Sequence, residues 1–242
     1  MEQVSQLSEE VTRKLLSEIR SGRYSNEKKL PPEVTLAAEL GVSRNLLRDC
    51  LTILEREGFI SRKHGVGTVI NKHVLEVKTR MDLEKEFLEM VSDAGYKAEI
   101  ALAAVNTIPS PKDVAKKLAL TEGEPVFEVK RLITADGKPA IYCIDYIGVC
   151  HVKTEDYDAE ELKKPIFYFL EQYCGEIVAM DLTEVRAVAA DEKLSEILKV
   201  SQGAPILFMD ETGYNFYGSP VLMSKEYYVD GILKHMVMRR KM

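Results

Sequence analysis

The chain has 242 residues, of which 45% are hydrophobic and 30% are charged, and its formal net charge is −6. This composition is typical of a globular protein, and no apolar run approaches the roughly 18 residues that a membrane-spanning helix needs. The N-terminus lacks a basic start and an apolar stretch, so we expect no secretion signal, no membrane partner and a cytoplasmic location. The cysteines form no C-x-x-C pair and the histidines complete no metal-ligand spacing, so we expect neither a metal nor a cofactor.

The charge is unevenly distributed along the chain. Residues 1–72 hold 12 lysines and arginines against 10 acidic residues, whereas the remaining 170 residues hold 21 against 29. A weakly basic head on an acidic body suits a protein that touches nucleic acid at one end only.

Two helices are expected before residue 42. The first ends at Gly22 and has apolar residues four apart, at Val11, Leu15 and Ile19. The second begins at Pro31-Pro32-Glu33, because proline followed by an acidic residue favours a first helical turn. It ends at Gly41, after an apolar face made by Leu36, Ala37 and Leu40.

A third helix follows after a two-residue link. Ser43 caps it, and it runs to about Glu57 before Gly58 ends it. Its apolar face consists of Leu47, Leu51 and Leu54, with Cys50 beside them, whereas Arg44, Asn45 and Arg48 fall on other faces. Two short helices joined this closely, with basic and amide residues opening the second, are typical of a helix-turn-helix, whose second helix enters the major groove of DNA.

Residues 59–70 predict a β-hairpin with a basic tip, which contains Arg62, Lys63, His64 and Gly65. Such a wing reaches phosphates or the minor groove. Gly65-x-Gly67 alone could indicate a nucleotide loop, but it precedes a strand rather than a helix. The two arginines of the third helix could by themselves be a solvated face; together with the turn and the wing they favour DNA contact.

The rest of the chain predicts a mixture of helices and strands. Residues 72–82 form a polar linker without the glycine and serine of a flexible one. Beyond it we expect a helix that begins near Leu83, a strand over 97–108, and helices over 111–120, 166–174 and 191–199 among further strands. The fold class is therefore α+β.

A quasi-repeat runs through this second part. Gly123-Glu124-Pro125 and Gly203-Ala204-Pro205 lie 80 residues apart, and the turns at Gly137 and Gly218 lie 81 apart. Two units are too few for a solenoid. We expect two halves of one antiparallel sheet with a crevice between halves and helices; two unrelated hairpins that share turn chemistry are the alternative.

The segment from Leu30 to Ile70, with its P-P-E, G-V-S-R and H-G-V-G-T elements, resembles the signature of the GntR family of bacterial regulators. The resemblance implies DNA contact by Arg44, Asn45, Arg48, His64 and Gly65. To these we add Ser43 at the helix start, and Arg62 and Lys63, which would position the wing on phosphates. Many members carry an arginine where this chain has Val34, so one familiar DNA contact is absent.

The body resembles the UTRA effector domain of the HutC subfamily, a fold related to chorismate lyase. The supporting motifs are K-R-L-I-T-A-D-G-K-P at 130–139, the second hairpin with G-S-P, and a final strand ending in Arg239-Arg240. The resemblance implies a homodimeric repressor of operator DNA that a small metabolite releases, often a sugar phosphate or another anion. It divides the chain into a DNA-binding domain (1–71), a linker (72–82) and an effector-binding and dimerisation domain (83–242).

The same resemblance implies an effector pocket. Its predicted residues are Glu86, Phe87, Arg131, Ile133, Cys143, Asp145, Ile166, Tyr168, Leu222 and Glu226. Sugar-phosphate-sensing relatives have R-x-R where this chain has Arg131-Leu132-Ile133. Because cationic and hydroxyl donors are lost and a carboxylate is gained, we expect an effector that is less charged and more apolar. The alternative is that Ile133 and Leu222 simply fill the core.

Two other functions compete with a ligand-controlled regulator. An enzyme is one, since the body resembles a lyase fold, but fold does not carry function. We find no nucleophile elbow, metal motif or assignable acid/base pair, and Asp145, Asp210 and Glu226 are better explained as polar residues on strands. We therefore expect no enzymatic activity. The other is a regulator that answers only to protein partners.

Overall fold

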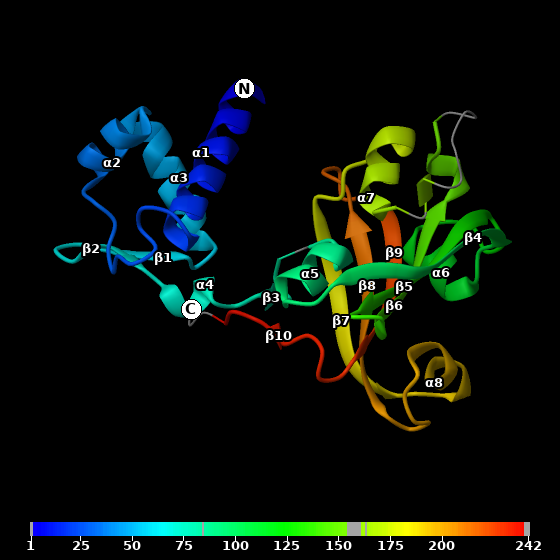
Figure 1. Cartoon of the computed structure of the whole chain (residues 1–242). Coiled ribbons are helices and arrows are strands. Elements are labelled where there is room, and N and C mark those ends of the chain that lie inside the picture. The colour runs from blue at the N-terminus through cyan, green and yellow to red at the C-terminus, as the bar shows by residue number, and fades with distance from the viewer. Residues whose placement is uncertain (1, 84, 154–160, 163, 240–242) are drawn as a thin grey trace. The chain divides into compact units, whose positions relative to one another are not determined.

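The computed structural model describes residues 2–83, 85–153, 161–162 and 164–239, which form two compact units (Figure 1). One unit comprises Met1–Asp82 and Met236–Met242, and the other comprises Leu83–His235. Both contain helices and antiparallel strands, which confirms the α+β class. No helix of the described residues is long and apolar enough to cross a membrane.

The first unit contains three helices and a hairpin, as the sequence predicts. These are α1 (Glu2–Arg20), α2 (Glu33–Leu40), α3 (Arg44–Arg56), β1 (Ile60–Lys63) and β2 (Gly67–Ile70). The strands pair antiparallel, with Ile60 opposite Ile70 and Lys63 opposite Gly67. Apolar residues of all three helices are buried together, among them Leu15, Ile19, Leu36, Leu47, Leu51 and Leu54. Burial of these leucines and isoleucines is the main force that holds the helices in place.

The turn between α2 and α3 is fixed by two local devices. Gly41 adopts the left-handed conformation, with φ of 68°, which ends α2. Two residues later the Ser43 hydroxyl accepts a hydrogen bond from the Leu46 amide, at 3.2 Å, and so caps α3. The direction in which α3 leaves the turn is thus set by residues 41–46.

Residues 72–82 are more structured than the linker that the sequence predicts. They contain a short helix, α4 (Lys72–Leu75), and a strand, β3 (Thr79–Arg80), which pairs with β10 (His235–Met236). Residues 236–239 accordingly belong to the first unit, although the sequence places them in the second domain. The prediction that the final strand ends in Arg239-Arg240 is wrong, because β10 ends at Met236; Arg240 lies outside the described residues.

The second unit is built on one six-stranded antiparallel sheet of order β4-β5-β6-β9-β8-β7 (Figure 1). Its strands are β4 (Ala98–Pro109), β5 (Pro125–Ala135), β6 (Lys138–Gly148), β7 (Met180–Ala189), β8 (Pro205–Tyr214) and β9 (Pro220–Val229). Its helices are α5 (Phe87–Asp93), α6 (Lys112–Lys117), α7 (Ile166–Phe169), the π-helix η3 (Leu170–Cys174) and α8 (Glu192–Leu198), with a 3₁₀ turn η1 (Val149–His151).

Alternate residues of the strands pack against different helices. Side chains from α6 meet Val126, Tyr146 and Met223, and those from α8 meet Tyr142 and Ile206. The residues next to these in sequence point to the other face, where Phe127, Ile147 and Leu222 pack against α7 and η3. Successive strand residues face opposite sides, so both faces of the sheet are covered.

The expected internal repeat is confirmed, and the alternative of two unrelated hairpins is not. The Ser110 amide bonds to the Glu124 carbonyl at 2.9 Å, and 80 residues on the Ala190 amide bonds to the Ala204 carbonyl at 2.8 Å. Ala119 and Lys199, also 80 apart, both have φ of 53°. Strands β4-β5-β6 and β7-β8-β9 therefore form equivalent halves, which β6 and β9 join by direct pairing.

Gly41→Ala should lower the free energy of unfolding of the first unit by about 1–2 kcal/mol, because a Cβ disfavours the left-handed conformation. A Cβ at this position would meet nothing within 4 Å, so the cost is conformational rather than steric. Gly41→Asn is the matched control and should cost less, since asparagine tolerates this conformation. Urea unfolding checks both; equal stability of Gly41→Ala and wild type would contradict the expectation.

Candidate functional site

The start of α3 presents a polar surface. Arg44, Asn45 and Arg48 are all exposed, on the side opposite the buried Leu47 and Leu51. Because these residues occupy the first two turns, they share the end of the helix where unpaired amide groups give a partial positive charge. This surface suits a negatively charged ligand.

Arg48 is held by a carboxylate from α2. Its Nε donates to Glu33 at 2.8 Å, and this hydrogen bond together with the Glu33 charge raises the pKa of Arg48. The contact is exposed, so it orients the guanidinium rather than adding much stability. Val34 follows Glu33 and is 56% exposed, so an apolar side chain stands there in place of the arginine that many relatives carry.

The tip of the β1–β2 hairpin is basic and exposed. Lys63, His64 and Gly65 lie there, and Gly65 has φ of 76°. Lys29 also reaches the tip, where its Nζ donates to the Val66 carbonyl at 2.9 Å. Sequence reasoning missed Lys29, because only the non-local bridge between Lys29 and Val69 brings it to the hairpin. A groove runs beside these residues, between the hairpin and the start of α2.

Arg62 lies in a different environment from its neighbours at the tip. Its Nε donates to Glu55 and its second terminal nitrogen to Thr52, at 2.8 Å and 2.9 Å, and its side chain is only 27% exposed. These bonds join β1 to α3. The sequence predicts that Arg62 contacts a DNA phosphate. In the structure its guanidinium instead holds the hairpin against α3.

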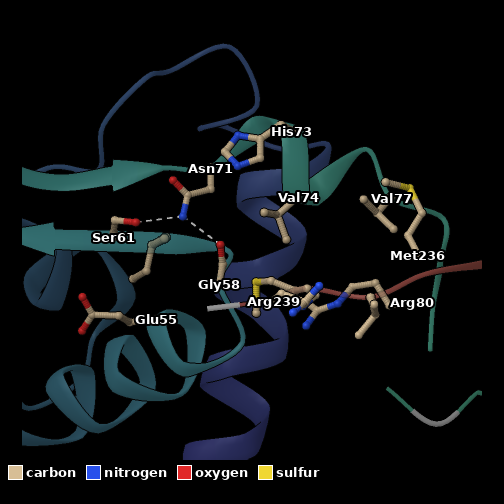
Figure 2. A pocket seen from close by; sticks show the side chains of 13 residues that line it. Glu55, Gly58, Ser61, Asn71, His73, Val74, Val77, Arg80, Met236 and Arg239 are labelled. Carbon is tan, nitrogen blue, oxygen red and sulfur yellow. Dashed lines mark hydrogen bonds between the residues drawn. The ribbon is translucent and has the colours of Figure 1, made fainter. Parts of the chain in front are cut away.

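A largely apolar cavity of about 590 Å³ lies at the other end of β1 (Figure 2). Its lining residues include Ile60, Val74, Val77, Met236, Val237 and Met238, with Arg80 and Arg239 among its polar ones. On one wall, the side-chain amide (Nδ2) of Asn71 donates to the Gly58 carbonyl at 2.8 Å and to the Ser61 hydroxyl at 2.9 Å. The cavity is thus lined by the hairpin, α4 and the returning C-terminal segment.

Arg80 fastens this segment to the end of α3. It is 8% exposed, donates to the Glu57 carbonyl at 2.7 Å, and lies over the Phe59 ring at 5.4 Å. The hydrogen bonds that it donates to Asp82 lower the pKa of that carboxyl group, against the opposing effect of burial. The next residue, Met81, donates its amide to the Met236 carbonyl at 2.8 Å.

The second unit holds a narrow cavity on the sheet face that α7 covers. Seven of the ten predicted effector residues line it: Glu86, Phe87, Arg131, Asp145, Ile166, Leu222 and Glu226. Five lining residues were not predicted: Lys85, Phe167, Asp181, Glu211 and Ser224. The internal repeat could have pointed to Glu211, because Glu211 lies 80 residues after Arg131 and so occupies the equivalent position in the second half.

The other three predicted residues do not line the cavity. Tyr168 is 47% exposed, and its neighbour Phe167 lines the cavity from α7. Ile133 is buried in the core. Cys143 is fully buried beside the cavity, with Sγ 3.8 Å from an Asp145 oxygen, and burial raises the pKa of its thiol well above the usual value.

Arg131 and Asp145 form a buried ion pair on one side of the cavity, with 2.7 Å between guanidinium and carboxylate. Asp145 also accepts from the Ser224 hydroxyl at 2.7 Å, and Arg131 donates to the Lys164 carbonyl at 3.1 Å. The guanidinium lies over the Phe87 ring at 5.6 Å. Its Nε is buried and has no hydrogen-bond partner among the described residues.

The opposite side of the cavity is acidic. Glu211 accepts from the Thr183 hydroxyl at 2.7 Å and lies next to Glu226. Burial raises the pKa of Glu211, and it does the same for Asp181 and Glu86. Five carboxyl groups and two cations line the cavity, so it is more acidic and less apolar than the sequence suggests. No cluster of three or more His, Cys, Asp or Glu side chains in the described part of the chain could hold a metal ion.

Comparison with known proteins finds a family match in each of the two units. Residues 7–70 match the family described as bacterial regulatory proteins, gntR family, and residues 93–230 match the UTRA domain. An HTH-type transcriptional regulator of Rhizobium meliloti, RB1450, is 25% identical over 210 residues, which cover 86% of this chain and 84% of that protein.

Two Bacillus subtilis proteins give similar results. The HTH-type transcriptional repressor NagR is 23% identical over 222 residues, covering 90% of this chain and 88% of its own. The crystal structure of a possible transcriptional regulator, YydK, superposes with a TM-score of 0.76 at 20% identity, covering 96% of this chain and 99% of that one. The chain therefore belongs to the GntR family of bacterial transcriptional regulators, among the members that combine a DNA-binding helix-turn-helix with a UTRA domain.

Proposed function

We propose that the chain is a repressor that binds operator DNA through α3 and the β1–β2 wing and leaves it when a small effector occupies the cavity on the sheet. The observation that carries the DNA half is the exposed set of Arg44, Asn45 and Arg48 at the start of a capped helix. NagR, a relative of similar length, is named a repressor. The protein would act in the cytoplasm and catalyse no reaction.

Roles within the DNA interface follow from side-chain chemistry. Arg44 and Arg48 suit guanine, which offers two acceptors in the major groove, and Asn45 suits adenine. Lys63 and His64 at the wing tip, with Lys29 beside them, suit phosphates. Ser43 acts through its hydroxyl, which caps α3, and Gly65 acts through its backbone, as the left-handed residue of the tip. Arg62 would support the wing from Glu55 rather than contact DNA directly.

A homodimer is supported by the edge of the sheet. Strand β7 is an outer strand, and its apolar side chains Met180, Leu182 and Val185 are 64%, 69% and 44% exposed. A long apolar edge strand is a hazard unless another chain covers it. We propose that a second copy does so, which would present two heads to half-sites about 10 base pairs, or a multiple, apart.

We propose that effector binding changes DNA binding through the segments that connect the two units, which are residues 230–236 and β3. Strand β9 carries Leu222, Ser224 and Glu226 of the cavity and continues through residues 230–234 into β10. Strand β10 pairs with β3, where Arg80 holds the carbonyl at the C-terminus of α3. We propose residues 1–71 as the DNA-binding domain, 72–82 with 236–239 as the coupling segment, and the remainder as the effector domain.

Arg48→Ala should weaken binding to a specific DNA site by about 1–3 kcal/mol, because it removes a base contact without touching the core. A site can be selected from random DNA by the purified protein, and fluorescence anisotropy gives the affinity. Arg56→Ala, at the far end of the same helix and 74% exposed, is the matched control and should change affinity little. Unchanged affinity of Arg48→Ala with an intact fold would refute the assignment of α3 as the reading helix.

Arg80→Met should increase amide hydrogen exchange at Gly58 and Phe59, because the Glu57 carbonyl before them loses a buried charged donor. Operator affinity should fall with it, since the end of α3 is no longer fixed. Lys78→Met is the control on the same segment, because Lys78 is exposed. If exchange and affinity in Arg80→Met match those of the control, Arg80 plays no part in coupling.

A further inference from the structure

The two halves of the sheet place different side chains at equivalent positions in the effector cavity. Arg131 lies opposite Cys143 in the first half, and Glu211 lies opposite Ser224 in the second. Asp145 lies opposite Val129, and Glu226 lies opposite Met209 in the same register. Glu211 is therefore the counterpart of Arg131, and Glu226 is the counterpart of Asp145.

Among the described residues that line the cavity, the second half of the sheet contributes no cation. In the first half a guanidinium meets a carboxylate, at 2.7 Å. In the second half two carboxyl groups, Glu211 and Glu226, meet instead. Burial raises the pKa of Glu211, against the opposing effect of its hydrogen bonds with Thr183 and Glu226.

The cations that line the cavity are engaged elsewhere. Arg131 is paired with Asp145. Lys85 contacts Glu89, at 3.1 Å, and Asp93, both outside the cavity lining. Asp181 lies close to the pair of glutamates, and Glu86 adds a further carboxyl group at the start of α5. A dianionic phosphate here would face these carboxylates with a single, already paired arginine, so like-charge repulsion disfavours it.

A second observation points to a ligand rather than to a self-contained acidic core. The Nε of Arg131 is buried within the lining and has no acceptor among the described residues. A buried donor without an acceptor costs about 1–3 kcal/mol, and a ligand oxygen would supply the acceptor. The part of the chain that is described contains no set of side chains arranged for a metal ion, which favours an organic group.

We infer that this cavity binds an effector with a positively charged amine or guanidinium, held by Glu211 and Glu226, and with a hydrogen-bond acceptor that meets Arg131. The inference rests on the proposed function, since it assumes that the cavity is where the effector acts. It names the chemical class that the carboxyl groups lining the cavity favour: a cationic effector in place of an anionic one.

Paired probes test the charge requirement on the full-length protein. Lysine is compared with Nε-acetyllysine, putrescine with N,N′-diacetylputrescine, and agmatine is included as a guanidinium; glucose 6-phosphate is the anionic probe. Thermal shift at millimolar concentrations, followed by calorimetry, measures binding. At least one cation should raise the unfolding temperature while its acetylated form and the sugar phosphate do not.

Glu211→Gln should weaken binding of that cation by roughly ten- to a hundred-fold, which is the loss expected for a charged hydrogen bond. Glu211→Asp keeps the charge and should retain the preference for the cation over its acetylated form. Glu192→Gln is the matched control, because Glu192 lies on α8, is exposed and does not line the cavity. It should bind like wild type.

Three results would overturn the inference: no cation of the panel binds, the phosphate or a neutral probe binds instead, or Glu211→Gln binds the cation as well as Glu192→Gln does. Operator affinity without any probe is measured on the same preparations. Absence of specific DNA binding there would refute the proposed function, whereas intact DNA binding with a failed cation test would refute the effector class alone.

Discussion

The pairing of β6 with β9 is the contact on which the second unit depends. Ile141–Tyr146 run antiparallel to Met223–Tyr228, and this ladder joins two three-stranded halves into one sheet. Without it each half would expose an unpaired inner edge, which invites wrong pairing. The same ladder sets Asp145 beside Ser224 and Cys143 beside Glu226, so the floor of the cavity exists only because the halves are joined.

Sequence reasoning succeeded where the determining forces are local. The periodicity of leucines predicted α3, the Ser43 cap and Gly41 fixed its start, and the repeated Gly-x-Pro elements predicted the two halves. It missed the pairing of β3 with β10, because two-residue strands carry no periodic signal and their partners lie more than 150 residues apart. The sequence pattern consequently places Arg80 in a polar linker, although the side chain is buried.

The candidate site was predictable only in part, for a related reason. Resemblance to a known domain pointed to Arg131, Asp145 and Glu226, all of which line the cavity. It misplaced Tyr168, because one residue along a helix turns a side chain by about 100°. In the sequence, Glu211 and Asp181 look like ordinary acidic residues on strands. Only the fold buries their carboxyl groups, and this burial raises the pKa of both.

A sheet made of two equivalent halves poses a problem of orientation for any molecule bound across its centre. If the halves were chemically identical, the molecule could enter in either of two senses related by the internal two-fold axis, and occupancy would be divided between them. The ion pair on one side and the paired glutamates on the other remove this degeneracy. The difference between the two halves thus makes the cavity asymmetric, so that the effector we propose would bind in a single orientation relative to β9.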